Sequence, residues 1–215
     1  MNTLIFANGD LELGDWILPY FQHADQIIGV DGGTQHLYTL NRLPTHIVGD
    51  FDSLENDILG WAKLNSVNLF QFPTDKDETD LELALKLGLG LSNKPILIFG
   101  VFGGRLDQLL ANVQLLAYPE AIGRSVTLIS KHERTFLIDG KATIQGNVGD
   151  IVSLLPFAGD VVVKQTSGLK WQLENSTLKM GFARGVSNVL NESRAQVEVE
   201  NGRLLCVHQY RPTNR

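Results

Sequence analysis

The stretch Ile47-Val48-Gly49-Asp50-Phe51-Asp52-Ser53 places two carboxylates directly after a short apolar strand. Side chains two residues apart in extended backbone point to the same side, so Asp50 and Asp52 offer two oxygen ligands to one hard metal ion. Asp, Ser and Gly are also ordinary turn and helix-cap residues. A single loop of this kind therefore does not distinguish a metal site from a simple turn.

Two further acidic loops follow predicted strands in the same half of the chain. They are Val30-Asp31-Gly32-Gly33 and Thr74-Asp75-Lys76-Asp77-Glu78-Thr79-Asp80, and the second opens a helix. Carboxylates repel one another, so a folded chain that gathers several of them usually holds a cation there. Three such loops at successive strand ends favour a cation site over turn formation alone.

Residues 1–131 alternate between short apolar runs and segments with helical periodicity. We expect strands at 4–7, 27–30, 46–48, 68–72, 96–99 and 126–129. Near-continuous apolar strands that alternate with helices are typical of a parallel sheet covered on both faces. The pattern predicts an α/β domain with a mostly parallel, Rossmann-like sheet, whose ligand crevice lies outside the carboxyl ends of the strands.

Two helix starts can be predicted from local chemistry. Ser53 is the expected N-cap of the helix that follows it. Thr79, with Glu82 three residues later, forms a capping-box pattern before the next helix.

The periodicity changes after about residue 131. We expect short strands at 135–137, 142–144, 151–155, 161–163, 197–199 and 204–207, with Gly-containing turns between them. Asn201-Gly202 between two alternating runs predicts a two-residue hairpin. Residues 132–215 should therefore form a small all-β sandwich or barrel.

Composition and charge argue against several classes of binding partner. The chain has 215 residues and a net charge of −6, without a basic stripe, which argues against nucleic acid as the main partner. No apolar run approaches the roughly 20 residues that span a bilayer, so we expect no membrane partner. The first residues lack a basic signal region, and we expect a cytoplasmic protein. The only cysteine, Cys206, cannot form an intrachain disulfide.

Two cations accompany the acidic loops. Lys76 lies inside one of them, and Arg105 follows Gly103-Gly104 after a strand. Glycines allow close approach of a phosphate, which an adjacent Arg can grip in a fork. Asp107 has three open roles: pairing with Arg105, capping the next helix, or facing a ligand. Scattered histidines and the lack of CxxC or HExxH patterns argue against zinc.

A second unusual patch lies in the β-rich half, where Thr166-Ser167-Gly168-Leu169-Lys170-Trp171 interrupts the strand pattern. Trp171 could stack on a flat ligand, with Ser187 and Asn188 supplying hydrogen bonds. A core tryptophan followed later by a turn explains these residues equally well.

Taken in order, these motifs span nearly the whole chain and include its change from an α/β to a β pattern. The set is Val30-Asp31-Gly32-Gly33, Gly49-Asp50-Phe51-Asp52-Ser53, Asp75-Lys76-Asp77-Glu78-Thr79-Asp80, Gly103-Gly104-Arg105-Leu106-Asp107, Ser167-Gly168-Leu169-Lys170-Trp171 and Ser187-Asn188. It resembles the thiamine pyrophosphokinase family. Residues 181–185 depart from the Ser/Thr-rich segment associated with that family.

The resemblance implies transfer of the pyrophosphoryl group of ATP to the hydroxyl of thiamine, with release of AMP. It implies a nucleotide- and metal-binding catalytic domain at 1–131, a thiamine-binding domain at 132–215, and a homodimer whose active site is shared between chains. The implied site residues are Asp50, Asp52 and Asp77 for Mg²⁺; Asp31, Gly32, Gly33, Lys76, Gly104 and Arg105 for ATP; Asp80, Arg105 and Asp107 for catalysis; and Trp171, Ser187 and Asn188 for thiamine.

Two alternatives remain open. A related pyrophosphokinase acting on another small alcohol, such as a pterin, would keep the acidic loops but should lack the Trp171 and Ser187-Asn188 motifs. A non-catalytic thiamine- or nucleotide-binding regulator should have lost an acidic ligand, and none is missing from the motifs.

Overall fold

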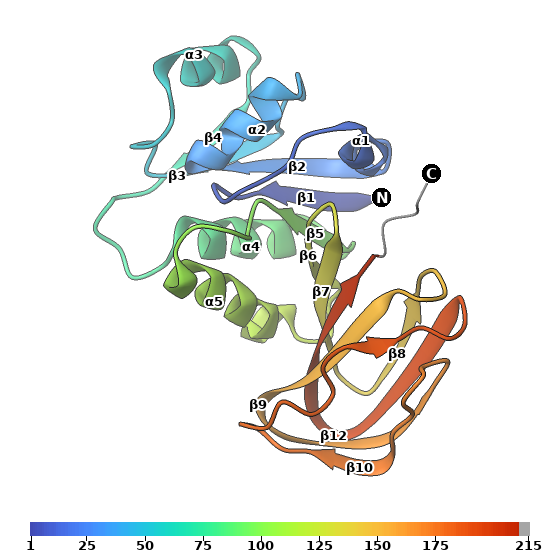
Figure 1. Cartoon of the computed structure of the whole chain (residues 1–215). Helices are drawn as coiled ribbons and strands as arrows, with labels where there is room; N and C mark the ends of the chain where they lie inside the picture. Colours follow the sequence, from blue (N-terminus) through green and yellow to red (C-terminus); the bar gives the residue numbers. More distant parts are fainter. Residues whose placement is uncertain (211–215) are drawn as a thin grey trace. The chain divides into compact units, whose positions relative to one another are not determined.

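The computed structural model describes residues 1–210. The chain forms two compact units, Met1–Lys131 and His132–Arg215, called here the N-terminal and C-terminal units (Figure 1).

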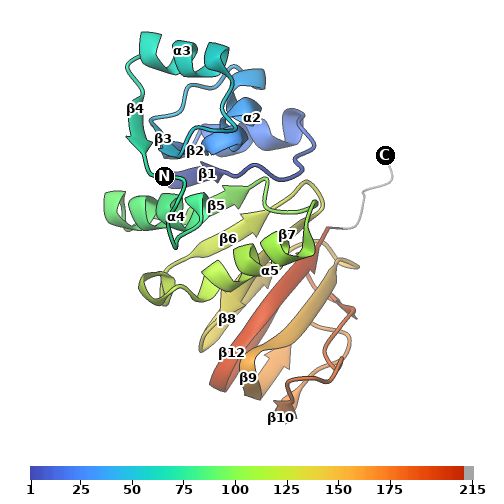
Figure 2. The ribbon, with the colours of Figure 1, turned by 90° about the vertical axis from the view of Figure 1, so that its left-hand side faces the viewer.

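The N-terminal unit is a parallel sheet with helices between its strands. The strands are β1 (Asn2–Phe6), β2 (Ala24–Val30), β3 (His46–Gly49), β4 (Asn68–Gln71), β5 (Ile96–Phe99) and β6 (Val126–Ile129). The helices are α1 (Leu18–Phe21), α2 (Thr34–Thr39), α3 (Asn56–Leu64), α4 (Asp80–Leu91) and α5 (Leu106–Gln114). The strand order is β4-β3-β2-β1-β5-β6, and neighbouring strands pair in parallel (Figure 2). Among residues 1–210, no helix is both long and apolar enough to cross a membrane.

Successive side chains of β1 face opposite sides of this sheet, as strand geometry requires. Phe6 stacks on Phe99 of β5, with ring centroids 5.0 Å apart, in a cluster that also contains Leu37 of α2. Ile5 faces the other side, where a Cβ added to Gly88 of α4 would lie 3.5 Å from its Cδ1 atom. Apolar residues on both faces of one strand require helices on both faces of the sheet.

The chain order reverses at β1, which pairs with β2 on one side and β5 on the other. The loops after β1 and β5 meet at this switch point, where the Gly9 amide donates a hydrogen bond of 2.7 Å to the Gly100 carbonyl. A Cβ at Gly9 would lie 2.7 Å from the Phe102 carbonyl oxygen, so only glycine permits this approach. Ligand crevices of open α/β sheets lie at such switch points.

One of the two predicted helix caps is wrong. Helix α3 begins at Asn56 after Glu55, without a side-chain cap, and the Ser53 hydroxyl instead donates to Asp52 Oδ1 at 2.9 Å. The cap at Thr79 is confirmed, because its hydroxyl oxygen accepts a hydrogen bond from the Glu82 amide at 3.2 Å.

Thr79→Ala should lower the free energy of unfolding by about 1 kcal/mol, because the Glu82 amide loses its acceptor. Urea denaturation measures the change. Thr39→Ala is the matched control, since Thr39 lies within α2 and its hydroxyl bonds the Gln35 carbonyl of the preceding turn. Equal effects of the two substitutions would show that the Thr79 cap does not contribute.

The C-terminal unit is all β. Its strands are β7 (Glu133–Ile138), β8 (Lys141–Gln145), β9 (Ile151–Ser167), β10 (Glu174–Leu178), β11 (Asn188–Val189) and β12 (Arg194–Gln209). Their pairings are antiparallel, with β12 between β9 on one edge and β7 and β8 on the other. Cys206 is fully buried in the core of this unit. An α/β unit with a parallel sheet followed by an all-β unit confirms the predicted fold class.

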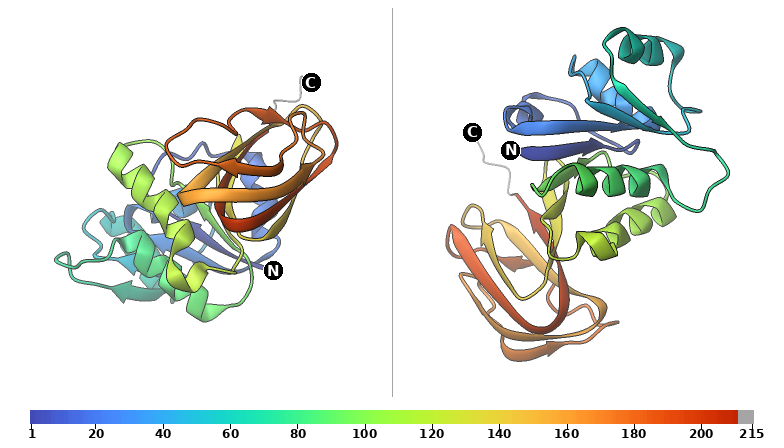
Figure 3. Two further views of the ribbon diagram at one scale, coloured as in Figure 1. Left: turned by 90° about the horizontal axis from the view of Figure 1, so that it is seen from below. Right: turned by 180° about the vertical axis from the view of Figure 1, so that it is seen from behind.

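The predicted hairpin at Asn201-Gly202 is wrong. These residues lie inside the continuous strand β12, which pairs with β9 before and after them (Figure 3). The register shifts around Asn201, Gly202 has φ +85°, and Ala158 of β9 has φ +61°. Positive φ values serve bulges as well as tight turns, and here the bulges bend two long paired strands.

Candidate active site

Three carboxylates gather at the carboxyl ends of the neighbouring strands β2 and β3. Asp31, Asp50 and Asp52 each offer a ligand oxygen, and these oxygens lie within 4.8 Å of one another. Asp31 directly follows β2, and Asp50 directly follows β3. Adjacent parallel strands end at the same edge of a sheet, which is why acids from two separate sequence motifs meet. We call these three side chains the acid cluster.

Asp31 is the buried member of the acid cluster, with 7% of its surface exposed. Its Oδ1 atom is buried without a hydrogen-bond partner, and its backbone has φ +44°. Burial raises the pKa of Asp31, and the charges of Asp50 and Asp52 raise it further. A strained, buried and incompletely paired carboxyl is costly, and such residues are concentrated at functional sites.

The surroundings of Asp50 lower its pKa, whereas those of Asp31 raise the pKa of Asp31. The Asp52 amide donates a hydrogen bond of 3.1 Å to Asp50 Oδ1 and lowers the pKa of Asp50, and the charge of Lys76 lowers it further. The acid cluster therefore contains an ionised carboxylate beside a buried carboxyl that resists ionisation. A bound cation would favour the charged form of both.

The Lys76 ammonium contacts acids rather than open solvent. Its Nζ atom donates to the Pro73 carbonyl at 2.9 Å and lies 3.1 Å from Asp80 Oδ1 and 3.9 Å from Asp50 Oδ2. Only 12% of the Lys76 side chain is exposed. This lysine is therefore part of the acidic site and not a freely mobile surface cation.

A cavity of about 600 Å³ extends from the acid cluster across the switch point. Its lining comes from the loops after β1, β2, β3, β4 and β5, from the start of α4, and from α5. The lining residues are Ala7, Asn8, Gly9, Val30, Asp31, Asp50, Thr74, Lys76, Glu78, Thr79, Asp80, Leu81, Gly100, Val101, Gly103, Gly104, Arg105, Gln108 and Asn112. This volume is in the range of small-molecule and cofactor sites.

Arg105 and Asp107 form an ion pair at one part of this lining. Arg105 Nε donates to Asp107 Oδ1 at 3.1 Å, and the pairing lowers the pKa of Asp107. Helix α5 begins at Leu106, so Asp107 lies in its first turn and is not its N-cap. Of the three roles left open by the sequence, pairing is the one observed. Both side chains are well exposed, which leaves the pair able to open toward a ligand.

Some sequence-predicted residues lie outside both the acid cluster and the cavity lining. Asp77 is exposed and is not a member of the acid cluster among the described residues. Gly32 and Gly33 are buried and do not line the cavity. A Cβ at Gly32 would meet the Asn8 amide, and one at Gly33 would meet the β1 backbone. These two glycines allow the loop after β2 to pack on the loop after β1.

The cavity also contains residues that the sequence prediction missed, notably Asn8, Gly9, Gln108 and Asn112. Asn8 and Gly9 lie in the loop after β1, so the rule that identified Asp31 and Asp50 also applies to them. Asn112 lies in the last turn of α5, and its Nδ2 atom donates to the Val101 carbonyl at 3.1 Å. No local motif marks a helical Asn of this kind.

In the C-terminal unit, a loop presents Trp171 with 55% of its surface exposed. The Trp171 amide donates to Asn188 Oδ1 at 3.0 Å, and Asn188 Nδ2 donates back to the Trp171 carbonyl at 2.6 Å. Asn188 is buried, so this reciprocal pair fixes the backbone that carries the indole ring. The Lys170 ammonium lies 4.6 Å from the ring centroid.

Ser187 is next to Asn188 and has φ +60°. Its amide donates to the Ser153 hydroxyl at 3.0 Å, which fixes the turn before β11. The Ser187 side chain is exposed beside the buried Asn188. The two residues therefore differ in environment, although the sequence prediction gave both the same role.

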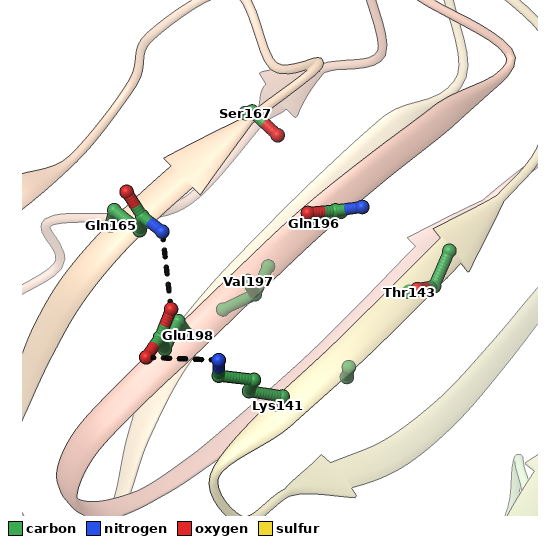
Figure 4. A pocket seen from close by; sticks show the side chains of 8 residues that line it. Lys141, Thr143, Gln165, Ser167, Gln196, Val197 and Glu198 are labelled. Carbon is green, nitrogen blue, oxygen red and sulfur yellow. Dashed lines mark hydrogen bonds and ion pairs between the residues drawn. The ribbon is translucent and has the colours of Figure 1, made fainter.

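A second hollow, of about 370 Å³, lies on the polar face of β8, β9 and β12 in the C-terminal unit (Figure 4). Its carboxylate, Glu198, pairs with Lys141 at 3.4 Å and accepts a hydrogen bond from Gln165 at 3.1 Å. The charges of this hollow compensate one another. The cavity of the N-terminal unit, with its incompletely compensated acid cluster, is therefore the candidate active site.

Two family models match the chain. The model described as "Thiamin pyrophosphokinase, catalytic domain" matches residues 18–128, within the N-terminal unit. The model described as "Thiamin pyrophosphokinase, vitamin B1 binding domain" matches residues 141–204, within the C-terminal unit. The acid cluster lies in the first matched region and Trp171 in the second.

Individual relatives and a solved structure belong to the same family as the two family models. Thiamine pyrophosphokinase of Bacillus subtilis is 30% identical over 210 residues, which cover 96% of this chain and 98% of the relative. Thiamine pyrophosphokinase 1 of Arabidopsis thaliana is 26% identical, covering 87% of this chain and 79% of the relative. The crystal structure of thiamine pyrophosphokinase from B. subtilis has a TM-score of 0.87 at 28% identity, covering 99% of this chain and 100% of that one. The predicted resemblance is confirmed, and the chain belongs to the thiamine pyrophosphokinase family.

Proposed function

We propose that this chain transfers the pyrophosphoryl group of ATP to the hydroxyl of thiamine, giving thiamine diphosphate and AMP. As a member of its family, it is a kinase-type transferase of thiamine metabolism. The observation that carries the proposal is the acid cluster at the edge of a cavity of nucleotide size. A polyphosphate substrate requires a cation, and the acid cluster offers a place for one.

The residues of the acid cluster are suited to a divalent metal. The donors are carboxylate oxygens, which hard cations prefer, and Asp31 Oδ1 is buried without another partner. Kinases generally use a divalent metal, and we propose Mg²⁺ held by Asp31, Asp50 and Asp52. When bound, Mg²⁺ would neutralise polyphosphate charge and act as a Lewis acid. Asp77 remains a predicted ligand.

Two cationic side chains and an open stretch of backbone would hold the phosphates. Arg105 would exchange Asp107 for phosphate oxygens, which its planar guanidinium can bind through two donors. Gly104 has φ +67°, and a Cβ there would have no neighbour within 4 Å, so the backbone at this point is open to a ligand. Lys76 would supply a second positive charge near the acid cluster.

We propose Asp80 as the hydrogen-bond acceptor that orients the thiamine hydroxyl. Asp80 lines the cavity at the start of α4, with its carboxylate beside Lys76. Phosphoryl transfer usually passes through a loose transition state, in which correct positioning matters more than full deprotonation of the nucleophile. Asp80 would therefore act by orienting the hydroxyl rather than as a strong base.

Thiamine would use the C-terminal unit. We propose that the exposed indole of Trp171 stacks on one of its rings, that Ser187 donates a hydrogen bond, and that Asn188 acts mainly by fixing Trp171. We also propose a homodimer in which both chains contribute to each active site, as the family resemblance implies. Sedimentation equilibrium would measure this assembly.

The decisive assay combines the protein with ATP, Mg²⁺ and thiamine. We expect AMP and thiamine diphosphate as products, and no turnover after EDTA removes the metal. Formation of ADP and thiamine monophosphate would contradict pyrophosphoryl transfer. Turnover of a pterin alcohol in place of thiamine would favour the related pyrophosphokinase, and binding without turnover would favour a regulator.

A further inference from the structure

Lys76 contacts one carboxylate of the acid cluster, Asp50, and one carboxylate outside it, Asp80. Its ammonium lies between Asp80 Oδ1, at 3.1 Å, and Asp50 Oδ2, at 3.9 Å, and the Pro73 carbonyl anchors it at 2.9 Å. These contacts join the loop before α4 to the loop after β3. The site therefore carries a positive charge of its own.

The contact between Lys76 and Asp50 is strengthened because both side chains are largely buried. With exposed fractions of 12% for the Lys76 side chain and 10% for that of Asp50, the contact is poorly screened by water. Lys86, another lysine of this region, has different partners and a more exposed side chain. It bonds Glu78 at 2.9 Å and Glu82 at 3.2 Å, does not line the cavity, and has 36% of its side chain exposed.

A lysine ammonium and a divalent cation compete when both neutralise the same carboxylate. Asp50 is a member of the acid cluster and also a partner of Lys76. The chain therefore faces two alternatives: Asp50 paired with Lys76, or Asp50 turned fully toward a metal. A bound polyphosphate favours the second alternative, because it offers Lys76 new anionic partners in the same cavity.

We propose that Lys76 is a resident counter-cation of the acid cluster. It holds Asp50 and Asp80 in the metal-free chain, weakens the binding of metal alone, and shifts to phosphate oxygens when metal and nucleotide enter together. Lys76 is thus a positioning residue that couples metal binding to nucleotide binding. Because coupling is reciprocal, metal and nucleotide strengthen each other's binding equally. The inference rests on the proposed function of the acid cluster as a metal site.

The test compares Lys76→Met with Lys86→Met, since each substitution removes one positive charge from the same region. Calorimetric titration measures Mg²⁺ affinity with and without a non-hydrolysable ATP analogue. For Lys76→Met we expect Mg²⁺ alone to bind about tenfold more tightly than to the unaltered chain, because the competing charge is gone. The ATP analogue should raise the Mg²⁺ affinity of Lys76→Met by a correspondingly smaller factor than it raises that of the unaltered chain. Lys86→Met should match the unaltered chain in both measurements.

Thermal unfolding gives a second readout that is independent of activity. In EDTA, Lys76→Met should unfold at a lower temperature than Lys86→Met, because Asp50 and Asp80 lose their shared cation. Mg²⁺ should raise the midpoint of Lys76→Met more than that of either other protein. Lys76→Gln, which keeps a donor for the Pro73 carbonyl, should show the same tightening of Mg²⁺ binding as Lys76→Met.

The outcomes separate this inference from the proposed function. Equal or weaker Mg²⁺ binding by both Lys76 variants, with normal metal binding by the unaltered chain, would overturn the inference alone. Loss of folding in both variants that Mg²⁺ does not restore would also overturn it, since Lys76 would then have a purely structural role. Absence of Mg²⁺ binding in every protein, even with the nucleotide analogue, would instead refute the metal site itself.

Discussion

Asp50→Asn is expected to reduce the turnover number by about 1,000-fold while leaving the chain folded. The substitution keeps the size of the side chain but removes its negative charge. The pKa of Asp50 is held low by the Asp52 amide and by Lys76, which favours its charged form. A neutral amide is a weaker metal ligand than a carboxylate, so the polyphosphate would lose much of its neutralising cation.

The measurement is the rate of AMP formation at saturating ATP and thiamine, with circular dichroism to check the fold. Asp57→Asn is the matched control, because Asp57 lies exposed in the first turn of α3 and outside the cavity lining. It should retain full turnover. Normal turnover in both Asp50→Asn and Asp52→Asn would refute the assignment of the acid cluster as the metal site.

The approach of Asp31 to Asp50 was predictable from the sequence, because it depends only on which strands are parallel neighbours. Short apolar runs followed by helices indicate a parallel sheet, and the loops after such strands converge at one edge. Membership of the acid cluster was harder to predict. Asp77 stands next to Lys76 in sequence, yet Lys76 points inward to Asp50 and Asp80 while Asp77 is exposed.

Long-range pairing explains the main error in the C-terminal unit. Asn201-Gly202 supplies the same positive-φ backbone to a hairpin and to a bulge, so its local signal is ambiguous. The outcome depends on β9, which pairs with β12 on both sides of Gly202. The role of Asn188 depends in the same way on the backbone of Trp171, 17 residues away. No local pattern contains that contact.

Trp171→Ala is expected to raise the KM for thiamine about 10- to 100-fold and to leave the KM for ATP nearly unchanged. Trp171 lies in the C-terminal unit with its indole largely exposed, so its removal leaves no core cavity. The loss would be that of aromatic stacking, about 1–3 kcal/mol. Trp171→Phe should have a smaller effect, because it keeps an aromatic face. Equal increases in both KM values would remove Trp171 from the thiamine site.

Asn188→Ala distinguishes a stacking indole from one that matters only for folding. The substitution leaves the indole in place but removes both side-chain hydrogen bonds to the Trp171 backbone. Leaving these groups unpaired should cost about 1–3 kcal/mol of stability and also allow the ring to move. If Trp171 acts by stacking, Asn188→Ala should raise the KM for thiamine selectively, and adding it to Trp171→Ala should raise that KM no further. Independent, additive effects of the two substitutions would mean that Asn188 contacts thiamine itself, because a residue that acts only through the indole has no effect once the indole is gone.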